Sequence, residues 1–261
     1  MNELNHRTTE RILEVLELLA QNNKEGLSFS DISRELEIPK GSLHPLLSTL
    51  CNRKYIVFNK SNQRYYIGES LFALGRSYIN DSNILNQIDE VMESLTQEVH
   101  ATCFLGVLSG NEVFYLLKKN APGSLQVTAI PGYRLPSYCT GLGKAIISDK
   151  ERDDLKAMYP DGLKPITQHT ITDFDELYAQ LLDIRKTGFS YEREESSVHI
   201  QCIARAIRIN NKIVAAISVA FPVFIDNEVE INQIKKGLLK NAILVEEIIN
   251  KDTSKWIYSD F

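Results

Sequence analysis

The sequence lacks acidic residues over one long stretch. No Asp or Glu occurs between Ile38 and Gly68, although the whole chain has 34 acidic residues in 261 and a net charge of −5. At that average, a segment of this length would hold about four acids. The basic residues within it are Lys40, Arg53, Lys54, Lys60 and Arg64. One local surface is therefore positive in an acidic protein. Such a surface suits a polyanion, whereas strong nonspecific nucleic-acid binding by the whole chain is not expected.

Cysteine is scarce, and apolar runs are short. The cysteines, Cys51, Cys103, Cys139 and Cys202, are widely spaced and match neither a zinc-binding pattern nor a disulfide framework, so reduced thiols are expected. The N-terminus has no apolar signal core, and no apolar run approaches the roughly 20 residues that span a bilayer. We expect a cytoplasmic protein with no membrane partner and no resident cofactor.

The first eighty residues have the pattern of short amphipathic helices. Thr9 is expected to cap the first helix. The apolar positions of that helix have the spacing of one buried stripe: Ile12, Val15, Leu16 and Leu19. Ser30 is expected to cap a second helix, which ends at Ile38-Pro39 because the residue before a proline avoids the helical region.

The run from Ile38 to Leu50, I-P-K-G-S-L-H-P-L-L-S-T-L, predicts a turn followed by a third helix. With Ser42 as the N-cap, Pro45 is the third helical residue, whose N–H would have no helical acceptor in any case. The leucines that share one face are Leu43, Leu46, Leu47 and Leu50. The opposite face is small and polar, as a helix entering a DNA major groove requires.

Two β-rich runs, Tyr55–Phe58 and Arg64–Ile67, flank a polar turn and predict a hairpin. Three helices and a hairpin make a winged helix-turn-helix domain, which we assign to residues 1–68. A charge run alone more often marks a solvated face, but the cap, helix and basic hairpin here occur in the order that DNA binding requires. The residues expected to contact DNA are Lys40, Gly41, Ser42, His44, Ser48, Arg53, Lys54, Lys60 and Arg64.

A helical linker is expected over residues 69–82. The run from Glu69 to Asn80 is apolar on more than one face, so we expect it to pack on a partner subunit in a homodimer or homotetramer. An ordinary core helix is the alternative. The boundary to the second domain is placed at Asp81-Ser82-Asn83.

Residues 83–251 combine helices with hairpins. Helices are expected near 84–95, 141–148, 150–158, 173–187 and 227–250. Strands are expected at 101–108, 112–118, 125–130, 200–209 and 212–221, with turns at Ser109-Gly110-Asn111 and Asn210-Asn211. This grouping predicts an antiparallel sheet flanked by helices, an α+β ligand-sensing domain, followed by a C-terminal tail at 252–261.

Three segments of the chain resemble the IclR (isocitrate lyase regulator) family of transcription factors. The helix-turn-helix run followed by K-Y-I-V resembles the family's L-P-K-S-T-V-x-R-L-L-x-T-L. Gly132 to Ala145, G-Y-R-L-P-S-Y-C-T-G-L-G-K-A, resembles G-x-x-L-P-x-x-x-T-A-x-G-K-A. The third segment, Gly188 to Pro222, contains G-F-S-Y-E-R-E-E, Cys202-Ile203-Ala204 and A-A-I-S-V-A-F-P. Together the three motifs are specific, and they cover nearly the whole chain.

The resemblance implies a winged-helix DNA-binding domain, a helical linker and a GAF-like α/β effector-binding domain that takes small molecules, often organic acids. The matching motif positions imply that the effector-binding residues are Gly141, Leu142, Glu192, Cys202 and Ser218. The backbone N–H groups that begin the helix at Thr140-Gly141 could hold a carboxylate, with Cys202 and Ser218 as weak orienting donors.

The chain also departs from the family's pattern. Pro45 replaces a frequent arginine, so DNA readout is expected to shift to His44 and Ser48. Ala220 replaces a second serine, which predicts a less polar pocket on that side. His199 replaces a glycine and Ala206 a proline, so the effector's identity cannot be carried over from the family.

His199 and Cys202, at i and i+3, could be half of a metal site or a catalytic pair. No motif supplies further ligands, a general base or an oxyanion hole, so we expect a partly buried, satisfied histidine and a small apolar cysteine, with no metal and no catalysis. Lys144 lacks the glycine spacing of a phosphate-binding loop. The sequence predicts a repressor that binds double-stranded operator DNA sequence-specifically and is controlled by a small-molecule effector, a small organic or sugar acid. The alternatives are a small-molecule sensor that acts through protein contacts and a Cys/His enzyme.

Overall fold

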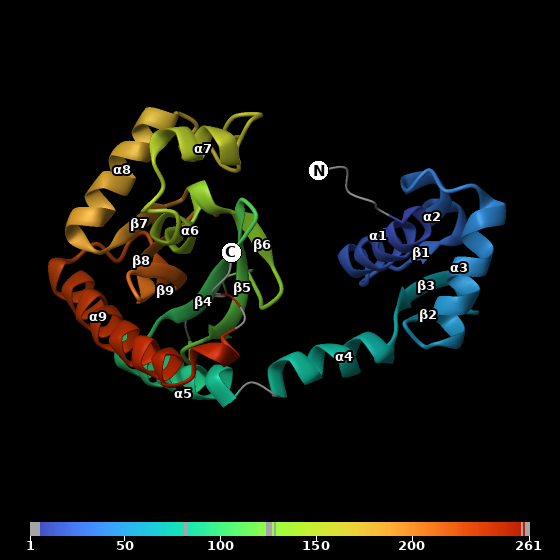
Figure 1. Cartoon of the computed structure of the whole chain (residues 1–261), viewed down its shortest axis with the longest axis horizontal. Coiled ribbons are helices and arrows are strands. Elements are labelled where there is room, and N and C mark those ends of the chain that lie inside the picture. The colour runs from blue at the N-terminus through green and yellow to red at the C-terminus, as the bar shows by residue number, and fades with distance from the viewer. Residues whose placement is uncertain (1–5, 81–82, 124–126, 128, 257, 259–261) are drawn as a thin grey trace. The chain divides into compact units, whose positions relative to one another are not determined.

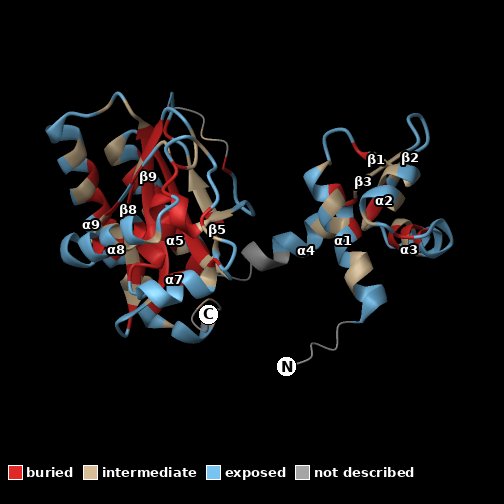
Figure 2. Ribbon diagram, turned by 90° about the horizontal axis from the view of Figure 1, so that it is seen from above, coloured by how far each residue is buried: buried red, intermediate tan, exposed pale blue. Residues whose placement is uncertain are grey.

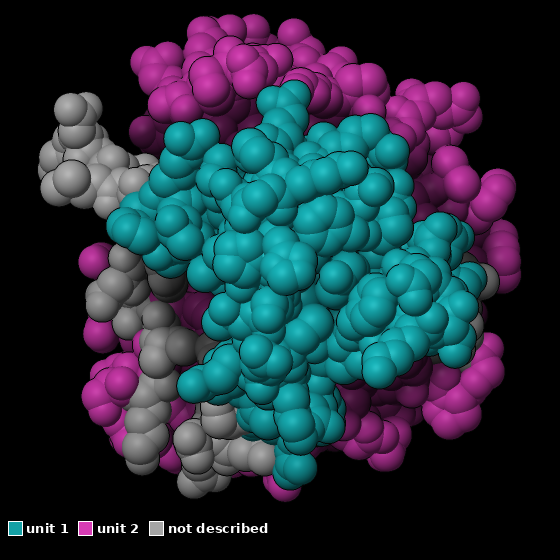
Figure 3. All heavy atoms as spheres, turned by 90° about the vertical axis from the view of Figure 1, so that its right-hand side faces the viewer, with its two compact units in different colours: residues 1–81 teal, residues 82–261 magenta. Residues whose placement is uncertain are grey.

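The computed structural model of the chain divides into two compact units, Met1–Asp81 and Ser82–Phe261 (Figures 1 and 3). It describes residues 6–80, 83–123, 127, 129–256 and 258. Asp81 and Ser82, where the sequence places the domain boundary, lie outside these ranges. Within the described part, no helix is both long and apolar enough to cross a membrane.

The first unit is a winged helix-turn-helix. Its elements are α1 (Arg7–Gln21), β1 (Leu27–Ser28), α2 (Phe29–Glu35), α3 (Lys40–Asn52), β2 (Ile56–Asn59), β3 (Arg64–Ile67) and α4 (Glu69–Asn80). The three strands form an antiparallel sheet in the order β1-β3-β2. Three of the four leucines predicted to share one face of α3 pack with α1, α2 and β2, whereas Leu46 is only half-buried and lies outside this cluster. The buried core is Val15, Leu19, Ile32, Ile38, Leu43, Leu47, Leu50 and Ile56. The predicted hairpin is confirmed, and the residues predicted to form a linker helix are helical in α4.

All three predicted helix starts in this unit are wrong. His6 rather than Thr9 is the N-cap of α1. Ser28 rather than Ser30 caps α2: its Oγ accepts from the N–H of Asp31, while the Asp31 carboxylate accepts from the N–H of Ser28, both at 3.1 Å. This reciprocal pair satisfies two free donors at once and so outcompetes the single hydroxyl of Ser30.

The helix α3 begins before Ser42. Its N-cap is Pro39, whose carbonyl accepts from the N–H groups of Ser42 at 2.9 Å and Leu43 at 3.0 Å. The fixed φ of proline is compatible with this flanking position. Pro45 therefore lies inside the helix, where it removes the N–H that would bond to the Gly41 carbonyl.

The second unit is built on a six-stranded antiparallel sheet in the order β6-β5-β4-β9-β8-β7. Its strands are β4 (Thr102–Ser109), β5 (Glu112–Lys119), β6 (Arg134–Pro136), β7 (Ser190–Arg193), β8 (Ile200–Ile209) and β9 (Lys212–Pro222). Its helices are α5 (Asn83–Val99), α6 (Gly141–Ile146), α7 (Arg152–Met158), α8 (Phe174–Thr187) and α9 (Glu228–Lys251), with 3-10 turns at Ser137–Cys139 and Thr253–Lys255. The predicted turn at Asn210-Asn211 is present, with both residues at positive φ, 49° and 66°. Two such residues form the primed turn that suits a hairpin's twist.

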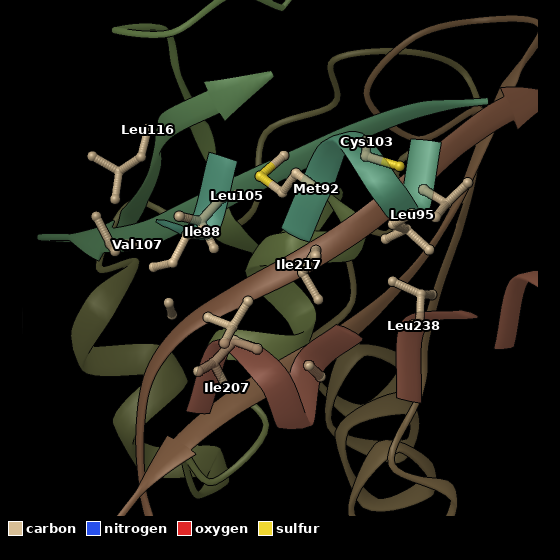
Figure 4. Close-up of a cluster of buried hydrophobic side chains, with 14 of the residues drawn as sticks. Ile88, Met92, Leu95, Cys103, Leu105, Val107, Leu116, Ile207, Ile217 and Leu238 are labelled. Carbon is tan, nitrogen blue, oxygen red and sulfur yellow. The ribbon is translucent and has the colours of Figure 1, made fainter. Parts of the chain in front are cut away.

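Both faces of this sheet are covered, which explains why its central strands read as nearly continuous apolar runs. On one face α5 and α9 pack over a core that includes Met92, Leu105, Ile217 and Leu238 (Figure 4). On the other face α6 packs on β8 and β9 around Phe104 and other apolar side chains. Buried residues are concentrated in these strands (Figure 2).

Three segments differ from the sequence prediction, and the first is the edge strand β7 (Ser190–Arg193), where no strand was predicted. The strand predicted at 125–130 falls partly outside the described residues, and Val127, Ala129 and Ile130 have no strand structure. The edge strand is instead β6, which pairs with β5. In the segment expected to be a tail, Trp256 is only 2% exposed and belongs to the core between the sheet and α5 and α9.

Candidate functional sites

The outer face of α3 carries most of the residues expected to contact DNA. Lys40, Gly41, Ser42, His44 and Ser48 are all exposed. A side chain at Gly41 would meet no atom within 4 Å, so the glycine leaves that part of the helix surface open. Lys60 is exposed in the turn between β2 and β3. This arrangement exposes a polar helix face and a wing cation, the groups with which winged helices in general contact base edges and phosphate.

The remaining basic residues are partly engaged within the unit. Arg64 is half-buried, and its Nη1 donates to the Gly26 carbonyl at 2.8 Å. Lys54 pairs with Glu69 of α4 at 2.8 Å, an exposed ion pair that raises the pKa of Lys54 through a hydrogen bond. Arg53 is exposed, while its carbonyl accepts from Ser70 at 2.8 Å. The sequence could not show these partners, because the Arg64 contact depends on the pairing of β1 with β3 and the other two depend on the turn that leads into α4.

A cavity of about 180 Å³ lies in the second unit, on the α6 side of the sheet. All five residues that the resemblance marks for effector binding line it: Gly141, Leu142, Glu192, Cys202 and Ser218. They come from four separate elements, α6, β7, β8 and β9. The strand register explains part of this convergence, because Glu192 lies opposite Cys202 across β7 and β8, and Cys202 lies opposite Ala220 across β8 and β9.

The start of α6 is held close to the sheet. Thr140 is its N-cap and accepts from the N–H of Gly143 at 2.9 Å. The Gly141 carbonyl accepts from Ser190 Oγ at 2.5 Å, and a Cβ at Gly141 would lie 3.1 Å from Cys202 Cβ. Glycine therefore permits the close approach of helix and strand. The first-turn N–H groups of Gly141 and Leu142 have no acceptor within their own helix.

The Glu192 carboxyl is the most perturbed acid at the cavity. It is 1% exposed, and its Oε1 accepts from the N–H groups of Glu195 at 2.6 Å and Ser196 at 3.1 Å. Burial is the main reason that its pKa is raised to about 7, and the backbone hydrogen bonds oppose that rise. Among the described residues, no hydrogen bond reaches its Oε2. This carboxyl therefore changes protonation near neutral pH.

A buried ion pair next to the cavity was not anticipated from the sequence. Lys144 of α6 is fully buried, and its Nζ contacts Glu195 Oε1 at 2.6 Å and Gln180 Oε1 at 2.8 Å. Burial raises the pKa of Glu195 although Lys144 lies against it. The Lys-Glu partners are 51 residues apart, so no local spacing could have indicated them. The pair fixes the loop whose Ser196 and Ser197 line the cavity.

A second set of contacts holds the same loop from outside. Thr167 and Thr170 each donate at 2.6 Å, to the carbonyls of Glu194 and Glu195 respectively. Ile166, at the start of this segment, lines the cavity and is 47% exposed. The two loops therefore form one hydrogen-bonded wall at the cavity's solvent side.

Most of the cavity wall is apolar. Phe104 and Tyr115 pack edge to face, with ring centroids 5.4 Å apart. Leu142 and Ala220 belong to the same apolar cluster. At position 220 the cavity wall therefore has a methyl group where a serine would provide a hydroxyl. Among the described residues that line the cavity there is no Lys, Arg or His. An apolar body with one polar end is the ligand shape that matches this lining.

The histidine expected to be partly buried is exposed. The His199 side chain is 84% exposed, and its Nδ1 lies 3.8 Å from Glu194. The prediction failed because His199 belongs to the turn before β8, where its φ is 66°, and not to the strand itself. Cys202, by contrast, lines the cavity, where burial first and the Glu192 carboxyl second raise its thiol pKa well above the usual range. Such a thiol is a poor nucleophile. No cluster of metal-binding side chains occurs among the described residues.

Comparisons with known proteins agree with this architecture. The family model for the bacterial transcriptional regulator IclR C-terminal domain matches residues 76–246, and the model for the IclR helix-turn-helix domain matches residues 8–60. The HTH-type transcriptional regulator BhcR of Paracoccus denitrificans is 26% identical over 238 residues, covering 90% of this chain and 85% of that protein. The HTH-type transcriptional repressor AllR of Escherichia coli is 28% identical over 215 residues, covering 82% and 79%.

Solved structures share the fold. An IclR transcriptional regulator from Alicyclobacillus acidocaldarius matches with a TM-score of 0.84 at 19% identity, covering 94% of this chain and 99% of that one. An IclR homolog from Microbacterium hydrocarbonoxydans, complexed with 4-hydroxybenzoate, matches with a TM-score of 0.79 at 21% identity, covering 94% and 100%.

Proposed function

The chain belongs to the IclR family of bacterial transcriptional regulators, and on that basis we propose that it is a repressor that leaves its operator when a small carboxylate occupies the cavity at Glu192. The observation that supports effector binding is that five residues from four different elements of the fold line one cavity. The repressor assignment is supported by relatives such as AllR, which is named a repressor.

The cavity's size and lining define the class of effector. An engineered protein cavity of about 150 Å³ accommodates benzene, so the 180 Å³ here suits one ring or a short carbon chain. The rings of Phe104 and Tyr115 favour a ligand with an apolar part on their side of the cavity. The relative crystallised with 4-hydroxybenzoate supports a ligand of this size.

Operator binding is proposed to use two or more copies of the chain. One α3 offers few base contacts, and a two-fold pair doubles them on an inverted repeat. Phe72 on α4 is 71% exposed, which supports the proposal that the linker helix packs on a partner subunit in a homodimer or homotetramer. In this proposal the DNA contacts are those on the exposed face of α3 and at Lys60.

The test measures DNA binding by fluorescence anisotropy, using upstream DNA with the full inverted repeat and with a half-site alone. The full site should bind more tightly, and benzoate or hexanoate should weaken that binding. Lys60→Ala should weaken binding to every DNA sequence and reduce the slope of log affinity against log salt concentration by about one unit. His44→Ala should instead reduce the difference in affinity between the operator and unrelated DNA. Equal affinity for the full site and the half-site would contradict the dimer. Unchanged salt dependence in Lys60→Ala would contradict the wing contact.

A further inference from the structure

The two oxygens of the Glu192 carboxyl have different surroundings. Oε1 accepts from two backbone N–H groups, at 2.6 Å and 3.1 Å. Oε2 is buried and receives no hydrogen bond among the described residues. A buried acceptor without a partner is costly, and a carboxylate has more acceptor capacity than two N–H groups satisfy. When the carboxyl is protonated, the proton belongs on Oε2, because Oε1 already faces two donors.

The cavity contains no compensating cation for an anionic ligand. Its described lining has no Lys, Arg or His. Two ammonium groups lie close by and are already engaged: that of Lys144 contacts Glu195 and Gln180, and that of Lys118 donates to the Val127 carbonyl at 2.6 Å and lies over the Phe104 ring. An ionised Glu192 and a ligand carboxylate would therefore repel each other in a site of low dielectric. A shared proton would replace this repulsion with a hydrogen bond between an acid and a carboxylate, which is a strong type of hydrogen bond.

We propose that this cavity binds its carboxylate effector together with one proton, held between the effector and Oε2 of Glu192. The proton comes from solvent, and no covalent bond changes. The inference depends on the proposed carboxylate effector and adds that the regulator's response is coupled to pH.

The groups around Glu192 are consistent with a proton at neutral pH. Burial raises the pKa of this carboxyl to about 7. The titratable and charged groups that face it or act on it are Tyr115 of β5, Cys139 of the turn before α6, Lys144 of α6, Glu195 of the following loop and Cys202 of β8. Desolvation raises the pKa of Tyr115, Cys139 and Cys202, so these three stay neutral. Tyr115, Cys202 and Glu192 are the members of this set that line the cavity, and Glu192 is the carboxyl among them.

The experiment is isothermal titration calorimetry of the full chain with benzoate and with hexanoate, from pH 6 to pH 8. With a carboxyl pKa of about 7, the protonated fraction falls from about ten elevenths to about one eleventh over this range. The apparent Kd should therefore rise about tenfold. Titrations at pH 8 in phosphate and in Tris, which differ in ionisation enthalpy, should report the uptake of close to one proton per ligand.

Glu192→Gln gives the sharpest comparison. The amide oxygen can accept from the same two N–H groups, and the amide NH₂ then takes the place of the protonated Oε2 as a permanent donor. This variant should bind both carboxylates with nearly the same affinity at pH 6 and pH 8 and without proton uptake. Glu194→Gln is the matched control: Glu194 accepts from the His199 N–H at 2.8 Å and does not line the cavity. It should keep the wild-type pH dependence.

Two results would overturn the inference while leaving the carboxylate effector in place. The first is binding by the wild type without proton uptake and without pH dependence. The second is a folded Glu192→Gln variant that retains the full tenfold change. If neither carboxylate binds between pH 6 and pH 8, the proposed effector class falls as well, while operator binding remains a separate measurement of the DNA-binding part of the proposed function.

Discussion

At the scale of single residues, Glu192 should make the stability of the protein depend on pH in the absence of ligand. Its pKa is about 7 in the folded chain against an ordinary value of 4.5. A carboxyl with a raised folded pKa contributes stability that is fully present below pH 4.5 and is lost as pH rises through 7. Glu192→Gln has no such loss. Its unfolding free energy should exceed that of the wild type by up to about 3 kcal/mol at pH 8.

Thermal and denaturant unfolding of both chains across pH 4.5–8 would measure this difference. The gap should nearly close as pH falls towards 4.5, where Glu192 is neutral in the folded state and about half protonated in the unfolded state. A gap of constant size would mean that the substitution acts through packing rather than through ionisation.

The ion pair of Lys144 and Glu195 provides a second prediction at this scale. Their side chains are 0% and 7% exposed, so Lys144→Met would leave a buried carboxylate without its partner. We expect a loss of about 3–5 kcal/mol, and a smaller loss in Lys144→Met/Glu195→Gln, where both charges are removed. Lys240→Met is the matched control, because its pair with Glu98 is largely exposed and should be worth less than about 1 kcal/mol. Urea unfolding of the four chains would test this order, and equal losses in Lys144→Met and Lys240→Met would contradict it.

At the scale of elements, Pro45 interrupts the hydrogen-bond pattern of α3. It lies in the helix interior and is exposed. Pro45→Ala should restore the hydrogen bond to the Gly41 carbonyl and stabilise the first unit by about 1–3 kcal/mol. Hydrogen exchange of the α3 amides in the full chain would detect slower opening. Unchanged or faster exchange would show that the proline's restriction of the unfolded chain outweighs the missing bond.

The errors of sequence prediction also belong to the element scale. Long apolar runs such as those of β4 and β9 were predictable, because strands buried on both faces leave a continuous signal. Helix starts could not be predicted in the same way. Ser28 and Ser30 are both plausible N-caps of α2, and only the reciprocal hydrogen bonds with Asp31 select Ser28. The short edge strand β6 has only three residues, too few to show a pattern.

The cavity was predictable only in part, because most of its contacts join residues that are far apart in the sequence. Its five matching residues were identified through the family's motifs. Physical reasoning on the sequence alone did not predict that they would meet at one cavity. Lys144 was judged only as a phosphate-loop lysine and rejected, and its true partner lies 51 residues away. Contacts over such separations depend on the strand order β9-β8-β7, which no local spacing encodes.

At the scale of the whole molecule, the two functions lie in different units, which should make them separable. The candidate DNA residues belong to Met1–Asp81 and the cavity to Ser82–Phe261. Ser218→Phe should fill the cavity from β9 without touching the first unit, since Ser218 is 2% exposed and lines the cavity. Operator affinity without ligand should stay close to the wild-type value. The ligand-induced change, a coupling typically worth about 1–3 kcal/mol, should disappear.

Ser218→Ala separates loss of space from loss of the hydroxyl. It removes one weak donor but keeps the cavity open, so operator binding should still respond to benzoate, at a higher concentration. Anisotropy with and without benzoate, together with melting curves for both variants, would distinguish these cases. A folded Ser218→Phe chain that still responds fully would place the effector outside this cavity. The five converging residues would then be structural, because a ligand cannot share the space that the phenyl ring occupies at the density of a packed protein interior.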